Sequence, residues 1–344
     1  MGPVTNALTS LALARAGQTR LPRYGMAIMV VAGVAPDLDY VSYFGGPSAF
    51  LRFHRAVLHS IVGTVFVAVV TASVFWAIDK RRSGEESPRP GAKPPLRFWT
   101  ALIAAVAGVV AHDLLDVASG VGVQLFWPFR TQRYGWYLLT NVDIWILIVL
   151  GAGLLIPELL RLVSDEIGER RKRVRGRFAA ILALVIFAAY VGARAVLRSR
   201  AIDLVMSSDY ERRTPLTADA FPVNSAPLEW RGVAATDATV EEISVSLAPG
   251  ARFEPERSRT TDKPQDSAAV RAGEAAADTV FYLRYARFPL ASMSQLEDGY
   301  RFEVHDLQFA GADLSPENTF VRVDLNSRLQ IVRQDIFFAA SPGP

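Results

Sequence analysis

The feature that most constrains this chain is a set of long apolar stretches in its first two hundred residues. Four of them are long enough to cross a bilayer as helices, which takes about 20 apolar residues. They run over residues 58–78, 98–122, 138–160 and 178–197. A fifth candidate, 24–44, is apolar as far as Pro36 and then becomes acidic, so it either spans or turns back together with the short apolar stretch 4–14. The sequence therefore predicts an α-helical integral membrane domain of four or five spans.

Charge divides the chain at about residue 200. The first 200 residues carry 23 Lys and Arg against 12 Asp and Glu, whereas the remainder carries 14 against 22. A basic, apolar half before an acidic, polar half is typical of a membrane domain joined to a soluble one, so we expect domains over 1–200 and 201–344. The arginines lack the interleaved aromatics of a stacking surface, which argues against a nucleic-acid partner. The absence of Cys excludes disulfides, Cys-ligated zinc and a Cys nucleophile.

After residue 200 the long apolar runs give way to short alternating ones. Period-two alternation, clearest in 241–247 and 301–304, indicates β-strands. The predicted strands are 228–235, 240–247, 300–309, 319–325 and 329–338. The Ala-rich stretch 266–286 predicts one helix, and the polar stretch 251–265 predicts a mobile loop. The predicted fold class is thus a helical membrane domain followed by a mainly β, α+β soluble domain.

The loop cations predict an orientation in the membrane. The loops over 79–97 and 161–177 hold six and seven Lys or Arg, whereas the two loops at the opposite face hold two each. Cation-rich loops face the cytoplasm, so the acidic C-terminal domain is expected outside it. Three cations at the outer end of the last span, Arg194, Arg198 and Arg200, oppose this orientation.

Histidines and acids stand out against the apolar background. On a helix His112 and Asp116 are one turn apart, so an imidazole and a carboxylate can hold the same metal ion. Asp37 and Asp39, two residues apart after Pro36, suit a turn around a cation, although a solvated turn is the commoner cause.

The predicted topology brings these residues to one membrane face. If 24–44 spans, the polar side chains of several segments all fall at the outer ends of their spans. They are Asp37, Asp39, His54, His59, His112 and Asp116, with Asp143 in support at the start of the next span. Ionisable groups at membrane depth are costly and tend to mark function. A carboxylate–histidine cluster suits Zn²⁺ first, and Mn²⁺ or Fe²⁺ second.

Several motifs resemble one family. They are Pro3-Val4-Thr5-Asn6-Ala7-Leu8, Ala35-Pro36-Asp37-Leu38-Asp39, His54-Arg55 with His59-Ser60, His112 with Asp116, Leu125-Phe126-Trp127-Pro128-Phe129, Val142-Asp143-Ile144-Trp145 and Pro227-Leu228-Glu229-Trp230-Arg231. In this order they resemble the LexA-binding, inner-membrane-associated metal-dependent hydrolases of bacteria. The resemblance implies a bacterial inner-membrane protein with a divalent-metal site, and its helical His–Asp element is distantly similar to those of zinc phospholipases C and S1/P1 nucleases. Where relatives commonly carry Thr-His near the N-terminus, this chain has Thr5-Asn6, and an Asn amide oxygen binds zinc poorly.

Two functions follow from these patterns. The first is an integral-membrane metal-dependent hydrolase, in which a metal-activated water attacks a phosphoester or similar bond of a lipid or envelope substrate. Its metal ligands would be Asp37, Asp39, His54, His59, His112, Asp116 and Asn6, and its catalytic candidates Asp39, His59 and Asp143. Arg52, Arg55 or Arg130 would then steady an anionic head group. The alternative is a non-catalytic membrane protein whose polar cluster is structural and whose soluble domain binds a protein partner that the sequence does not identify.

Overall fold

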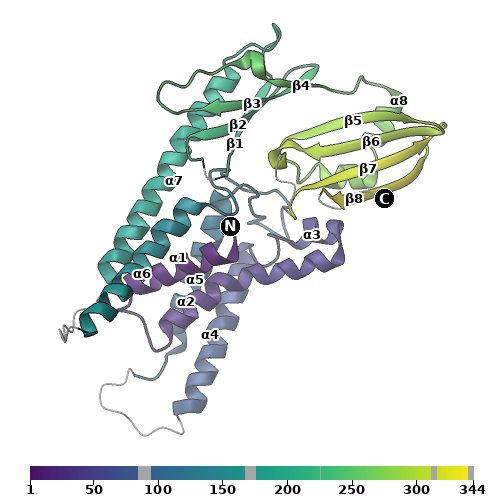
Figure 1. Ribbon diagram of the computed structural model, residues 1–344. Helices are drawn as coiled ribbons and strands as arrows, with labels where there is room; N and C mark the ends of the chain where they lie inside the picture. Colours follow the sequence, from purple (N-terminus) through teal and green to yellow (C-terminus); the bar gives the residue numbers. More distant parts are fainter. Residues whose placement is uncertain (84–93, 167–175, 225, 311–315, 340–344) are drawn as a thin grey trace. The chain divides into compact units, whose positions relative to one another are not determined.

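The computed structural model describes residues 1–83, 94–166, 176–224, 226–310 and 316–339 (Figure 1). The chain forms two compact units. The first consists of Met1–Asp39, Arg55–Arg130 and Tyr134–Ala195, and the second of Tyr40–His54, Thr131–Arg133 and Val196–Pro344. Some cations that predict the orientation, Arg89, Lys93 and those of 170–175, lie outside the described residues.

The first unit is helical. Its elements are α1 (Pro3–Ala16), α2 (Gly25–Val34), the first part of the 3₁₀ helix η1 (Ala35–Gly45), α4 (Ile61–Ser83), α5 (Phe98–Ala118), α6 (Ile144–Glu166) and most of α7 (Arg177–Met206). Within the described residues, five helical segments are long and apolar enough to cross a membrane: Gly25–Gly45, Ile61–Arg82, Phe98–Ala118, Ile144–Leu162 and Arg177–Met206. They include the four predicted spans and the fifth candidate, so the prediction of a helical membrane domain is confirmed.

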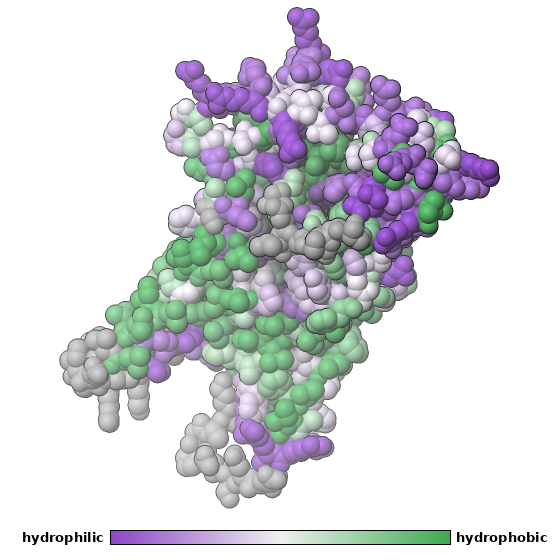
Figure 2. All heavy atoms as spheres, turned by 45° about the vertical axis from the view of Figure 1, so that its right-hand side comes forward, coloured by the Kyte–Doolittle hydropathy of each residue, from purple (hydrophilic) through white to green (hydrophobic). Residues whose placement is uncertain are grey.

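These helices expose apolar side chains on their outer sides. Ile103, Val65 and Leu155 are each more than half exposed, and Figure 2 shows hydrophobic side chains gathered along the helices. In water such a surface would be unfavourable, but acyl chains solvate it. The interior between α2, α4 and α5 is packed mainly by Ala, which lets the helices approach closely.

Two glycines set the crossing of α2 and α5. A Cβ on Gly108 would lie 2.3 Å from the carbonyl oxygen of Met29, and one on Gly33 would lie 3.2 Å from the carbonyl oxygen of Gly108. Only glycine therefore fits at this contact. One turn after Gly108 comes His112, so the close crossing brings its ring to the backbone of α2.

The span candidate Gly25–Gly45 changes helix type beside Pro36. Helix α2 ends at Val34, and the chain continues as η1, an 11-residue 3₁₀ helix. Because Pro has no N–H and clashes with the preceding turn, it favours such a change. A 3₁₀ run of this length is uncommon and often marks a functional segment. Both Asp37 and Asp39 lie on η1 and are buried.

The second unit contains two four-stranded antiparallel sheets. One has the order β1 (Thr217–Pro222), β2 (Glu229–Ala235), β3 (Thr239–Ser246) and β4 (Arg259–Asp262). The other has the order β5 (Pro289–Leu296), β6 (Gly299–Asp306), β7 (Thr319–Asn326) and β8 (Ile331–Phe338). The end of α7 packs on the first sheet through Val205, and the helices α8 (Ala268–Glu274) and α9 (Ala277–Tyr282) pack on the second. A helical membrane domain followed by a β-rich domain is therefore the observed fold class.

Four details of the second unit differ from the sequence prediction. The strands β1, β4 and β5 were not predicted, and each is the edge strand of its sheet, where partial exposure weakens the apolar alternation. The prediction of a mobile loop over 251–265 is wrong, because this stretch holds β4 and the short 3₁₀ helix η2 (Pro255–Arg257). The predicted helix over 266–286 is two helices, since Ala276 is extended and buried, and no Gly or Pro at 275–276 signals the break. The predicted strand 300–309 ends at Asp306, and η3 (Leu307–Phe309) follows.

The segment Tyr40–His54 belongs to the second unit, although its flanks belong to the first. Its helix α3 (Pro47–Phe53) places Leu51 in the apolar core beneath the β5–β8 sheet. Within this unit Tyr43 stacks on Phe338 with ring centroids 4.8 Å apart. The segment is thus fixed by aromatic and apolar packing.

Candidate metal centre

Helix α5 supplies the first two residues of the centre. His112 and Asp116 lie one turn apart near its end, and both side chains are fully buried. His112 Nδ1 lies 2.9 Å from the carbonyl oxygen of Gly33 on α2. Because a carbonyl can only accept, this contact favours a proton on Nδ1 and leaves Nε2 to face the other residues of the centre.

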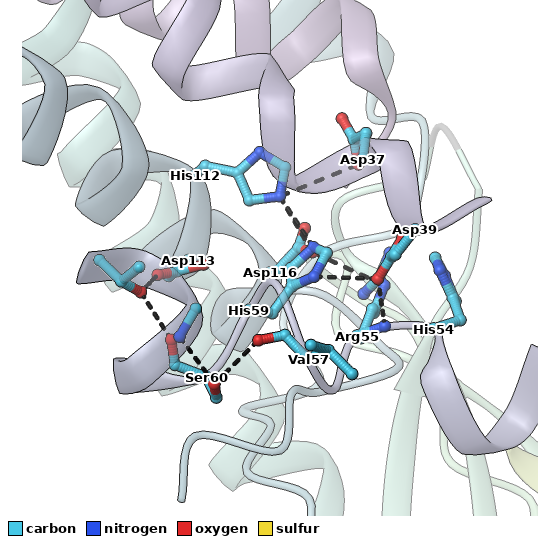
Figure 3. A network of polar contacts seen from close by, with 12 residues as sticks. Asp37, Asp39, His54, Arg55, Val57, His59, Ser60, His112, Asp113 and Asp116 are labelled. Carbon is cyan, nitrogen blue, oxygen red and sulfur yellow. Dashed lines mark hydrogen bonds and ion pairs between the residues drawn. The ribbon is translucent and has the colours of Figure 1, made fainter. Parts of the chain in front are cut away.

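His59 presents its ring to the same place from the turn before α4 (Figure 3). Its Nε2 lies 3.0 Å from Nε2 of His112. Its Nδ1 lies 3.1 Å from Asp39 Oδ2, an arrangement that favours a proton on Nδ1. Each imidazole is thus oriented by the contact of its Nδ1 atom, and the two Nε2 atoms face each other.

Carboxylates surround this meeting point. Asp37 Oδ1 lies 3.8 Å from His112 Nε2, and Asp116 Oδ2 lies 3.1 Å from His59 Nε2 and 3.6 Å from His112 Nε2. Asn6 Nδ2 donates to Asp37 Oδ2 at 3.1 Å, so the N-terminal helix α1 approaches the centre as well. Ligand atoms of Asp37, His59 and His112 all lie within 4.8 Å of one another, and this buried group could hold a metal ion.

The electrostatics of the centre favour a cation. Asp116 also contacts two cations, the amino group of Met1 and Arg55, whose Nε lies 3.6 Å from Asp116 Oδ2. Burial lowers the pKa of His59, but Asp116 and Asp39 outweigh burial and raise it to about 9. The two carboxylates therefore favour positive charge beside the His59 ring.

A divalent metal fits these residues. Two unprotonated Nε2 atoms 3.0 Å apart repel each other unless a proton or a metal ion lies between them. Two imidazoles and nearby carboxylates are a donor set for Zn²⁺, and also for Fe²⁺ or Mn²⁺. The contacts of Nδ1 to Asp39 and to the Gly33 carbonyl are the outer contacts that metal-binding histidines usually make.

The structure brings most of the predicted residues together within the first unit. They are Asn6, Asp37, Asp39, His59, His112 and Asp116. Of these, Asp39 faces Nδ1 of His59 rather than Nε2, and Asn6 contacts Asp37 through its amide nitrogen.

Two predicted site residues have other contacts. His54 lies in the second unit, where its ring stacks on Phe50 at 4.3 Å and its Nε2 lies 3.6 Å from Glu317 Oε1. Asp143 accepts from the backbone N–H of Trp145 at 3.0 Å at the start of α6 and from the hydroxyl of Tyr190 at 2.9 Å. The metal role of His54 and the catalytic role of Asp143 stay predictions.

Sequence reasoning missed two parts of the centre. The Gly33 carbonyl cannot be recognised from the sequence, because any residue offers one. The sequence names Arg55 as one of three arginines that could steady a substrate head group, whereas its side chain is buried and contacts Asp116. A cation between two histidines at the edge of an apolar run was the available signal.

Comparison with protein families gives a match to the helical part of the chain. The family model described as YdjM inner membrane protein matches residues 1–201, which is the helical part and more than half of the chain. No curated protein and no solved structure matches the chain.

Proposed function

Because this chain belongs to the YdjM inner membrane protein family, we propose that its buried Asp–His–His group is the divalent-metal site of an integral-membrane hydrolase. One observation carries the proposal: two buried imidazoles, each oriented through Nδ1, direct their Nε2 atoms at one point beside Asp37 and Asp116.

Each residue would have a distinct task. His59, His112 and Asp37 would bind the metal, and Asp116 lies close enough to the imidazoles to join them. Asp39 would orient His59. A bound divalent ion would supply the acidity that makes a water molecule nucleophilic near neutral pH.

The place of the site along the helices supports a lipid or envelope substrate. His59 lies just before α4 begins, and His112 and Asp116 lie in the last two turns of α5. Since α4 and α5 are consecutive helices packed on each other, the start of one and the end of the other lie at the same membrane face. A site at this level would meet head groups, and we propose a phosphoester or similar bond there as its substrate.

Metal analysis tests the proposal. Full-length protein purified in detergent without chelators should retain about one or more divalent ions per chain, and Asp37→Asn should lose most of them. Asp113→Asn is the matched control, because this neighbouring buried acid hydrogen-bonds to Thr64 Oγ1 at 2.6 Å. Metal-free wild-type protein would overturn the metal site, whereas metal-loaded protein that hydrolyses no phosphoester lipid would favour the non-catalytic alternative.

We further propose that the C-terminal domain lies outside the cytoplasm, because the cation-rich loops at the opposite membrane face are expected to be cytoplasmic. Two cations that oppose this orientation are held by the protein: Arg194 donates to the Leu138 carbonyl at 3.0 Å, and Arg198 pairs with Asp219. A reporter fused after Pro344 that is active only in the cytoplasm should be silent. An active reporter would invert the orientation and the face of the site.

A further inference from the structure

Arg55 is a buried cation beside the candidate metal centre. Only 1% of its surface is exposed, and its backbone has φ of +57°. Non-glycine residues rarely adopt this conformation, and where they do the surrounding contacts hold it. Here the Arg55 carbonyl accepts from Gln124 N–H at 2.9 Å, so the strained residue is fixed through its backbone.

The backbone of Arg55 also holds the acid behind His59. Its N–H donates to Asp39 Oδ2 at 2.7 Å. The same oxygen lies 3.1 Å from His59 Nδ1. The position of Asp39, and through it the direction in which His59 faces, therefore depends on the conformation at Arg55.

The side chain of Arg55 reaches the acid on the other side of His59. Its Nε lies 3.6 Å from Asp116 Oδ2, the oxygen that lies 3.1 Å from His59 Nε2. The two ends of the guanidinium donate to Ser119 Oγ at 2.8 Å and to Asn141 Oδ1 at 3.4 Å. The guanidinium plane is thus fixed by neutral acceptors while its charge faces Asp116.

We propose that Arg55 is the positioning residue of the metal centre, holding in place the two carboxylates that flank His59. The inference rests on the proposed metal site and adds to it a group that touches no metal. A guanidinium within a buried cluster, with its donors directed at protein acceptors, is suited to this role rather than to binding a head group. Lysine could not replace it, because an ammonium lacks the planar fork that spans Ser119 and Asn141.

Cobalt titration of full-length protein in detergent tests the inference, since the visible absorption of bound Co²⁺ reports its coordination geometry. Arg55→Gln and Arg55→Lys should each bind Co²⁺ about 10–100-fold more weakly, and the absorption bands should change in shape and intensity. The matched control is Arg52→Gln, since Arg52 is the neighbouring arginine and lies over the ring of Phe281 in the second unit. It should leave affinity and spectrum at wild-type values.

A second variant with a smaller change tests the inference in case the Arg55 variants do not fold. Ser119→Ala keeps Arg55 and removes one acceptor of its guanidinium, together with the hydroxyl's own hydrogen bond to the Asp116 carbonyl at 2.8 Å. The same spectral change should appear with an affinity loss of about two- to tenfold. The inference is overturned if Arg55→Lys matches wild type in both readouts, or if Arg55→Gln binds Co²⁺ as tightly as wild type with an unchanged spectrum. A wild-type protein that binds no Co²⁺ overturns the metal site, and this inference with it.

Discussion

In the first unit, the carboxylates of Asp37 and Asp116 and two imidazoles converge on one point, whereas in the β5–β8 sheet three acids each meet an arginine. The sheet pairs are Arg301–Asp324, Arg322–Glu303 and Arg333–Asp335, each with a shortest contact of 2.7 Å. The side chains of the sheet pairs are partly exposed, whereas those of the convergent cluster are buried. Partly exposed pairs lose little hydration and contribute little to stability.

Burial changes what the same groups require. Carboxylates removed from water are tolerated only with partners that compensate their charge. The convergent cluster has the cations Arg55 and Met1 beside Asp116, while the two Nε2 atoms of His59 and His112 still face each other. The comparison indicates that a candidate ligand site differs from a set of surface ion pairs in the convergence of its buried ionisable groups, and not in their number.

The largest expected effect comes from removing one histidine of the cluster. His112→Ala should abolish tight metal binding, with a loss of more than about a thousandfold, because one of two oriented Nε2 ligands is gone. His305→Ala in the sheet should retain the wild-type metal content, since its ring stacks on Phe320 at 4.8 Å within the second unit. Inductively coupled plasma mass spectrometry of both proteins measures this. Metal loss in His305→Ala would contradict the prediction that metal binding depends on the first unit and not on the β5–β8 sheet.

The second prediction concerns the core of the sheet region. Phe302 is fully buried under Gly273, where a Cβ would come within 2.4 Å of its ring. Phe302→Ala should lower the free energy of unfolding of the second unit by about 3–5 kcal/mol through lost burial and a cavity. Urea unfolding followed by circular dichroism measures this, with the exposed Val332→Ala as the control. An unfolding midpoint equal to that of the control would show that this core does not stabilise the unit.

The third prediction compares one acid from each region. Asp39→Asn should weaken metal binding about 10–100-fold, because the amide no longer holds the proton on Nδ1 of His59. Asp324→Asn, which loses the pair with Arg301, should bind metal as wild type does. Isothermal titration with Zn²⁺ gives both affinities. Equal affinities for the two variants would mean that Asp39 does not orient the imidazole.

The two regions also differ in how far the sequence predicts them. The membrane helices follow from length and apolar content alone. The strands β2, β3, β6, β7 and β8 follow from short apolar runs, in which the period-two alternation is clearest for β3 and β6. The edge strand β4 was not predicted, because a short and exposed strand has no buried apolar face and so shows no apolar alternation in the sequence. The convergence of Asp37, His59 and His112 could be predicted because spans fix which helix ends share a membrane face.

The fine structure of the centre could not be predicted in the same way. Whether Asp39 faces Nδ1 or Nε2 of His59 depends on the 3₁₀ conformation after Pro36, and spacing does not determine it. The contact of Arg55 with Asp116 likewise depends on a positive φ that arginine seldom adopts. Such features arise from tertiary packing, which local sequence patterns do not record.

The smallest expected effect is a pH dependence in the sheet. The neighbouring His305 imidazole and the Arg322 guanidinium lower the pKa of Glu303 to about 2 from its ordinary 4.5. A carboxylate with a depressed folded-state pKa stabilises the fold above the unfolded-state pKa, and this contribution is lost as the pH falls from about 4.5 to 2. A shift of that size would correspond to about 3 kcal/mol, but solvent screening of a partly exposed pair reduces it to about 1 kcal/mol. Glu303→Gln should therefore unfold in urea about 1 kcal/mol more easily than wild type at pH 7 and equally at pH 2. A difference between the two proteins that stays constant over this range would show that the pair with Arg322 does not stabilise the sheet.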